Sequence, residues 1–189
     1  MAVLDERSWA EAIGMYAHRY TIAKVTGRKH QDWALDVCTL MRGETPDARG
    51  WRTVDFHEGD VERLDDPFYP FVSLPSASST TEAWRARVGE IPRSSARRFL
   101  VALSTPWLNV ERERDFVRHR PALEEKADVI LSRFPEGSRF YANTGPDSKD
   151  IDYYQRVSGC STVSRHDWDL GLVLVSDSEV GMVWSFDPK

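Results

Sequence analysis

The stretch RHDWDLGLVLVSDSEVGMVWSFD (residues 165–187) decides the fold. Two apolar runs, LGLVLV and VGMVWSF, flank the polar tetrapeptide SDSE, which is the pattern of a β-hairpin with a short loop. Leu172 and Leu174 fall on one face of the first strand, and Val173 and Val175 fall on the other. Because both faces are apolar, we expect this hairpin to be central in its sheet or covered by helices.

Upstream of the hairpin the pattern is mostly helical. PALEEKADVILSRF (121–134) carries apolar residues at helical spacing and begins with a proline, which suits the first helical position. DWALDVCTLMRG fits a helix or a strand, and the capping potential of Asp32 together with Gly43 favours a helix. The same spacing rules predict further helices over residues 9–20, 81–91 and 94–103, and strands over residues 51–56, 138–143 and 152–159.

This order of elements predicts an α+β fold. We expect N-terminal and central helices to pack on one face of a mostly antiparallel C-terminal sheet that ends in the β-hairpin. A chain of 189 residues is long enough for one domain, and we expect a single domain over residues 1–189. The segment 66–80 is rich in proline and serine, so a boundary inside that domain would fall there.

Composition and charge limit the functional classes. The net charge is −5, yet the segment from Trp84 to Arg120 carries +5, so the rest of the chain carries −10. An acidic whole argues against non-specific nucleic-acid binding. Two cysteines, no signal-like N-terminus and no apolar run of membrane-spanning length predict a soluble, cytoplasmic protein without a membrane partner.

No strong catalytic or cofactor motif is present. The chain lacks the phosphate-binding GxxxxGK[ST], the dinucleotide-binding GxGxxG, the zinc-binding HExxH, paired CxxC motifs and GxSxG. We therefore expect no cofactor and no bound metal.

Three weak clusters remain as candidate sites. Asp55, His57 and Asp60 offer ligands for Mg²⁺ or Mn²⁺, although an exposed acidic edge strand is the simpler interpretation. His166 and Asp169 begin the quoted stretch, where a polar entrance to the hairpin, with Asp169 stabilising a turn, is favoured over a site.

The third cluster is the pair Arg97 and Arg98 near a predicted helix start. It suits an anion, and the basic residues of 112–120 add to its field. The favoured interpretation of the whole set is a solvated helix face paired with acids at helical spacings, namely Glu111, Glu113, Asp115 and Glu124.

Two main hypotheses follow for function. The first is a small acidic protein-binding module that presents the Asp55–Asp66 segment to a basic protein, of the type of bacterial immunity proteins that inhibit a toxin. Any exposed member of the seven tryptophans would strengthen such a surface. The second is an enzyme acting on a small anionic substrate. In it, His57 or His166 is the general base, a carboxylate such as Asp169 orients that base, and Arg97 or Arg98 holds the anion. A nucleic-acid binder using residues 84–120 ranks third.

Overall fold

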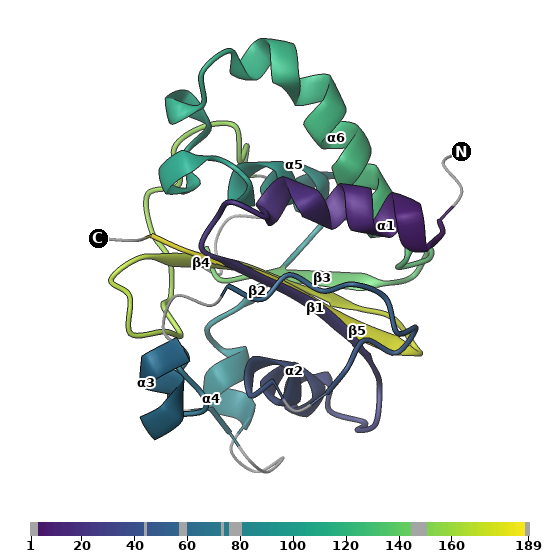
Figure 1. Cartoon of the computed structure of the whole chain (residues 1–189), viewed down its shortest axis with the longest axis vertical. Helices are drawn as coiled ribbons and strands as arrows, with labels where there is room; N and C mark the ends of the chain where they lie inside the picture. The colour runs from purple at the N-terminus through teal and green to yellow at the C-terminus, as the bar shows by residue number, and fades with distance from the viewer. Residues whose placement is uncertain are drawn as a thin grey trace.

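The predicted hairpin lies at the centre of a five-stranded antiparallel sheet (Figure 1). The computed structural model describes residues 4–43, 45–56, 60–72, 74–75, 81–144 and 151–187. The strand order is β1-β5-β4-β3-β2. The strands are β1 (Thr21–Gly27), β2 (Gly89–Ile91), β3 (Arg139–Ala142), β4 (Asp169–Val175) and β5 (Glu179–Phe186).

Helices cover both faces of this sheet, whereas we expected them on one. Leu172 and Leu174 belong to a core shared with α1, α5 and α6, and Val173 and Val175 belong to a second core shared with α2 and α4. Both layers are visible above and below the sheet in Figure 1. Helices lie on both faces because both faces of the hairpin are apolar and must be buried. The helices are α1 (Glu6–Ile13), α2 (Trp33–Met41), α3 (Asp60–Asp65), α4 (Thr81–Arg85), α5 (Arg93–Leu103) and α6 (Phe116–Ser132).

The N-terminal region combines correct and wrong predictions. The helix α1 begins with a reciprocal capping box between Asp5 and Ser8 but ends at Ile13, well before Tyr20. A short 3₁₀ helix, η1 (Gly14–Tyr16), follows, and then the strand β1, which we did not predict. The helical prediction for residues 33–41 is confirmed, and the side chain of Asp32 accepts a hydrogen bond from the backbone of Ala34.

Four other elements differ from the predictions. The predicted helix over 81–91 stops at Arg85, because β2 takes its last residues to pair with β3. Residues 152–159 form no strand, and residues 51–56 contribute a single bridge between Val54 and Ala23. The predicted helix at 121–134 is confirmed, but α6 begins earlier, at Phe116. Within the described ranges, no helix is long and apolar enough to cross a membrane.

A close contact joins the two central strands. Gly171 on β4 pairs with Trp184 on β5, and a Cβ added to Gly171 would lie 2.0 Å from Cδ2 of the Trp184 ring. The ring therefore occupies the space above the glycine. It is fully buried, and its Nε1 donates to Asp169 Oδ1 over 3.0 Å.

A buried ion cluster ties α6 to the sheet and to the segment before Trp51. The Arg133 guanidinium is fully buried and makes paired hydrogen bonds to Asp47, at 2.8 and 2.9 Å, and to Glu179, at 3.1 and 2.8 Å. The rings of Trp9 and Trp51 lie 4.7 and 5.2 Å from its central carbon. Both carboxylates and both rings thus compensate the desolvation of one cation.

Candidate functional site

Asp169 is a structural anchor at the start of β4. Its carboxylate is fully buried and accepts five hydrogen bonds. Oδ1 accepts from Asn143 Nδ2 and Trp184 Nε1, and Oδ2 accepts from the backbone N–H groups of Val163 and Ser164 and from the Ser164 hydroxyl. A carboxylate with this many donors is satisfied by the protein itself. It holds the loop before β4 against the sheet.

His166 lies in the loop that Asp169 organises. Its backbone N–H donates to the Ser164 hydroxyl over 3.2 Å, and its ring lies 5.2 Å from the ring of Phe186. Since Asp169 is surrounded by other donors, the described contacts do not make it the partner that orients the His166 ring.

The guanidinium of Arg97 is engaged by the protein's own carboxylates. Its Nε and Nη2 donate to Asp128 at 2.7 and 2.8 Å, and its Nη1 lies 3.0 Å from Glu124. Burial alone would raise the pKa of Glu124, but hydrogen bonds from Tyr154 and Arg120, with the charges of Arg97 and Arg120, lower it to about 2. Arg98 makes a longer contact of 3.8 Å with Asp152.

The acidic segment is placed only in part. His57 lies outside the described residues, and Asp60 is the first residue of α3. Asp55 is paired with Lys24 at 2.5 Å and with Arg63 at 3.1 Å. Burial opposes ionisation of Asp55, yet these two cations lower its pKa. In the described part of the chain, no group of three or more His, Cys, Asp or Glu is arranged to hold a metal ion.

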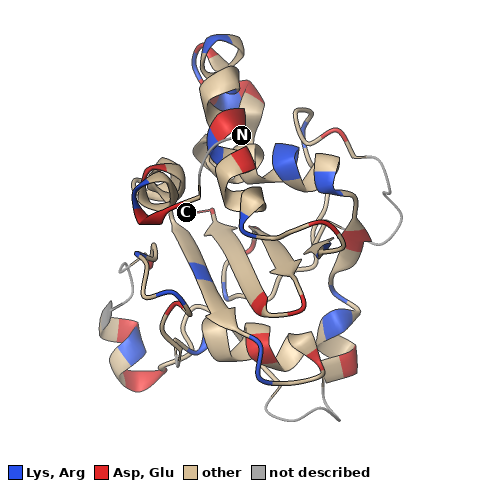
Figure 2. Cartoon of the chain, turned by 90° about the vertical axis from the view of Figure 1, so that its right-hand side faces the viewer, with Lys and Arg blue, Asp and Glu red and all other residues tan. Residues whose placement is uncertain are grey.

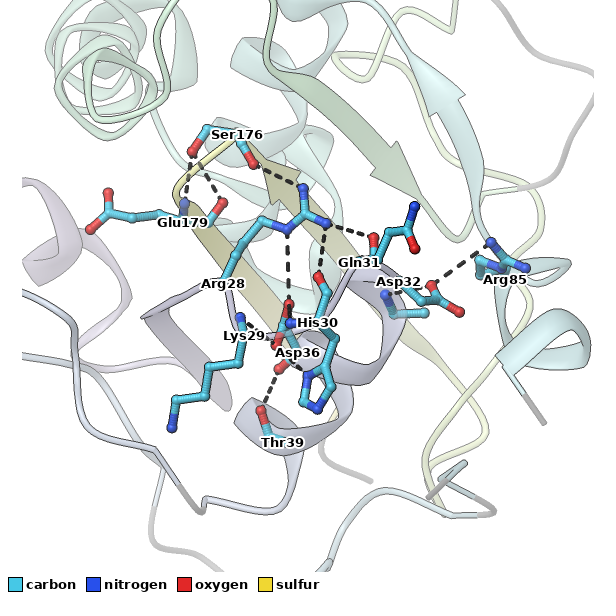
Figure 3. A network of polar contacts seen from close by, with 11 residues as sticks. Arg28, Lys29, His30, Gln31, Asp32, Asp36, Thr39, Arg85, Ser176 and Glu179 are labelled. Atoms are coloured by element: carbon cyan, nitrogen blue, oxygen red, sulfur yellow. Dashed lines mark hydrogen bonds and ion pairs between the residues drawn. The ribbon is translucent and has the colours of Figure 1, made fainter. Parts of the chain in front are cut away.

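A further polar network supports the loop between β1 and α2 (Figure 3). Asp36 is buried and accepts from His30 Nδ1 at 2.7 Å and from the backbone N–H groups of Lys29 and His30. Arg28 donates to the carbonyl groups of Ser176, His30 and Gln31. These bonds fix the loop, and we assign the His30–Asp36 pair this supporting role.

A hollow with chemically distinctive residues lies beyond the end of β5. We call it the Trp107 cleft. It has a volume of about 790 Å³. Its walls come from η3 (Pro106–Leu108), η4 (Val110–Arg112), the loop before β4 and the residue after β5. They combine two tryptophans, two arginines and two acids with small and polar residues: Trp107, Leu108, Asn109, Glu111, Arg112, Arg156, Val157, Ser158, Trp168 and Asp187.

Backbone strain marks the wall of this cleft. Trp107 and Leu108 have φ values of 58° and 52°, the left-handed region that side chains other than glycine rarely adopt. Each costs roughly 1–2 kcal/mol and persists only where the surroundings hold it. Leu108 is buried, while Trp107 remains 52% exposed between the Trp107 cleft and a neighbouring hollow of about 220 Å³.

A second surface feature is an apolar face on α3. Val61 and Leu64 on the helix and Phe68 in the turn after it are 74%, 83% and 41% exposed. The spacing of Val61 and Leu64 places these two on one side of the helix. Arg63 instead turns inward, where it donates to Asp55 and to the Tyr69 carbonyl. We call the exposed residues Val61, Glu62, Leu64, Asp65 and Phe68 the α3 surface.

Charge is otherwise mixed over the molecule. Figure 2 shows both signs dispersed over the helices and connecting segments. The basic segment 84–120 is partly neutralised by pairs to acids outside it, among them Arg97 with Asp128 and Arg85 with Asp32. Arg97 lies on α5 and its partners Asp128 and Glu124 lie on α6, so this pairing joins two helices.

The sequence predictions missed the Trp107 cleft. Its residues come from three separate segments, so no local spacing could reveal them. The sequence contains seven tryptophans, which suggested an exposed aromatic surface but did not indicate which of them would be exposed. In three comparisons, this chain matched no protein-family model, no curated protein and no solved structure. Its function is therefore inferred from its own residues.

Proposed function

We propose that this protein is a protein-binding module whose α3 surface docks onto a basic partner protein, in the manner of an inhibitor or immunity protein. The observation that carries the proposal is the exposure of Val61 and Leu64, three residues apart on α3, with Phe68 exposed in the turn that follows. Large apolar side chains this exposed on one short segment are typical of interaction sites. We propose that they form the apolar centre of an interface.

The charges around this apolar centre select the partner. Glu62 and Asp65 are exposed, whereas Arg63 is directed inward to Asp55. The α3 surface therefore presents carboxylates without a compensating exposed cation of its own helix. A partner with an apolar patch bordered by lysine or arginine is complementary to it. A second copy of this chain is less suitable, because the carboxylates would face one another.

The alternative of an enzyme with a histidine–carboxylate pair and an arginine clamp has weaker support. Asp169 is enclosed by five donors, and all three nitrogens of the Arg97 guanidinium contact carboxylates of the protein. An enzyme would need other residues for orienting the base and binding the anion. These contacts support the binding module over that particular active site.

The test compares Leu64→Asp with Val117→Asp. Val117 is 86% exposed on α6, so it controls for adding a carboxylate to an exposed apolar position. Proteins captured from the native cell extract by the wild type are identified, purified and titrated against all three forms by calorimetry. We expect Leu64→Asp to weaken binding at least about tenfold, as for an interface hot spot, and Val117→Asp to bind like the wild type.

Two results would overturn the proposal. One is that the wild type captures no protein that the Leu64→Asp form fails to capture. The other is that a purified partner binds both variants equally. Self-association that is lost in Leu64→Asp, measured by light scattering, would identify a second copy as the occupant instead. Binding to a basic partner should also weaken as salt is added, because exposed charges are screened.

A further inference from the structure

The Trp107 cleft combines three kinds of recognition group. Trp107 and Trp168 supply flat aromatic faces, Arg112 and Arg156 supply cations, and Asp187 supplies an acceptor. A volume of about 790 Å³ lies in the range of sites for small organic ligands. The cleft shares no residue with the α3 surface, so it can be considered independently of the proposed function.

The aromatic wall is presented outward. Trp107 is 52% exposed, although tryptophan usually hides its ring, and its left-handed backbone holds the indole at the rim. Arg112 lies against this ring, with its central carbon 5.5 Å from the ring centre. A flat ligand can therefore stack on the Trp107 indole beside the Arg112 guanidinium.

The Arg156 guanidinium is available to bind an anion. Arg156 is exposed and makes no ion pair or side-chain hydrogen bond with any residue that the structure describes. A guanidinium binds phosphate or carboxylate oxygens through two parallel hydrogen bonds. Arg156 therefore differs from Arg97, whose nitrogens contact Asp128 and Glu124.

The acceptor lacks a partner. Asp187 Oδ1 is shielded from solvent and accepts no hydrogen bond in the described structure. Burial raises the pKa of Asp187, against the opposing charges of Arg112 and His166. An oxygen that is shielded from water and accepts no hydrogen bond destabilises the folded state. A ligand that donates an N–H or O–H group to Asp187 would remove this penalty.

We infer that the Trp107 cleft binds a nucleoside monophosphate. Its base stacks on the tryptophans, its phosphate is held by Arg156 and Arg112, and an amino group of the base or a ribose hydroxyl donates to Asp187. An aromatic carboxylate would use the rings and the arginines but would bring fewer donors for Asp187. A nucleotide is the class of metabolite that uses all three kinds of group at once.

The experiment is calorimetric titration of the full chain with AMP, GMP, CMP and UMP, each compared with its nucleoside, with ribose 5-phosphate and with inorganic phosphate. We expect at least one monophosphate to bind with a submillimolar Kd. Its nucleoside and ribose 5-phosphate should each bind about tenfold more weakly or worse, because each lacks one recognition group.

Variants locate the site. Trp107→Ala should weaken the monophosphate about tenfold or more, since stacking is lost. Arg156→Gln should weaken the monophosphate similarly but leave the nucleoside unchanged. Arg118→Gln, which removes an exposed charge from α6, is the matched control and should have no effect. If Trp107→Ala fails to fold, Arg156→Gln carries the test alone, because its side chain is exposed.

Four outcomes would overturn the inference. No monophosphate binds at millimolar concentration. Inorganic phosphate or ribose 5-phosphate binds as tightly as the nucleotide, which would leave a simple anion site. Binding is unchanged in both Trp107→Ala and Arg156→Gln, which would place it elsewhere. Only single-stranded oligonucleotides bind, which would make the cleft part of a nucleic-acid groove.

Discussion

At the scale of single residues, Gly171 allows the Trp184 ring to pack at the centre of the sheet, because the glycine has no side chain. The Trp184 ring fills the space where a Cβ would lie, 2.0 Å from Cδ2, and reaches Asp169 through Nε1. We predict that Gly171→Ala displaces this ring, breaks its hydrogen bond and lowers the free energy of unfolding by about 3 kcal/mol or more. Urea denaturation measures the change.

Gly14→Ala is the matched control for that substitution. Gly14 has helical backbone angles, and no atom would lie within 4 Å of its added Cβ. Here alanine should stabilise the protein by about 0.5–1 kcal/mol, because it restricts the unfolded chain and favours the helix. If Gly171→Ala were as harmless as Gly14→Ala, the close packing of Trp184 on the glycine would be wrong.

At the scale of elements, Glu124 joins α5, α6 and the segment containing Tyr154. It contacts Arg97, Arg120 and the Tyr154 hydroxyl, the last at 2.6 Å. Its pKa falls from an ordinary 4.5 to about 2, so the ionised carboxylate favours the folded state above pH 4.5. That contribution is lost as the pH falls from 4.5 towards 2.

We therefore predict that Glu124→Gln lowers the free energy of unfolding by about 1–2 kcal/mol at pH 7, a value reduced from the full pKa shift to allow for solvent screening. The difference from the wild type should shrink below pH 4.5 and nearly vanish at pH 2. Thermal unfolding across this pH range measures it. Glu125→Gln, at the exposed neighbouring position, should change stability by less than about 0.5 kcal/mol at every pH.

Elements were predictable where the sequence itself contains the cause. Asp32 caps α2, and the two apolar faces of LGLVLV specify a doubly covered strand. The strand β1 was missed because Lys24 interrupts its apolar run, and only the structure shows that Asp55 neutralises that lysine. The strand β2 has three residues, and its conformation depends on pairing with β3, which a local pattern does not reveal.

The same distinction applies to candidate sites. From the sequence we interpreted Asp169 as capping a turn ahead of Gly171, whereas the residue begins β4 and its carboxylate accepts from Val163 and Ser164 in the preceding loop. Whether its carboxylate is free depends on Asn143 and Trp184, which lie 26 and 15 residues away. The Trp107 cleft depends on the meeting of η3, the loop before β4 and the end of β5. Such a meeting follows from the topology and has no sequence signature.

At the scale of the whole molecule, Arg133 connects both ends of the chain. Arg133 directly follows α6, its partners Glu179 and Asp47 come from β5 and from the segment before Trp51, and its side chain is fully buried. We predict that Arg133→Leu lowers the free energy of unfolding by about 3–5 kcal/mol, because Asp47 is left buried without its cation and Glu179 keeps only a 3.5 Å contact with Arg49. Guanidinium chloride titration measures the change.

Arg139 provides the comparison for this prediction. It makes the same paired contact with Glu90, at 3.1 and 2.6 Å, but both side chains are more than half exposed. Arg139→Leu should therefore cost less than about 1 kcal/mol. Adding Asp47→Asn and Glu179→Gln to Arg133→Leu should recover part of its loss. Equal effects of the two arginine substitutions would contradict the importance of burial.

The position of β5 between β1 and β4 has a consequence for biosynthesis. Thr21 opens β1, and its strand partner is Ser185, which leaves the ribosome 164 residues later. Throughout that interval β1 lacks its strand partner, and its pairing must wait until β5 has been synthesised. A stop codon just before Glu179 would therefore remove the middle of the sheet and leave β1 separated from β4, rather than trim an edge.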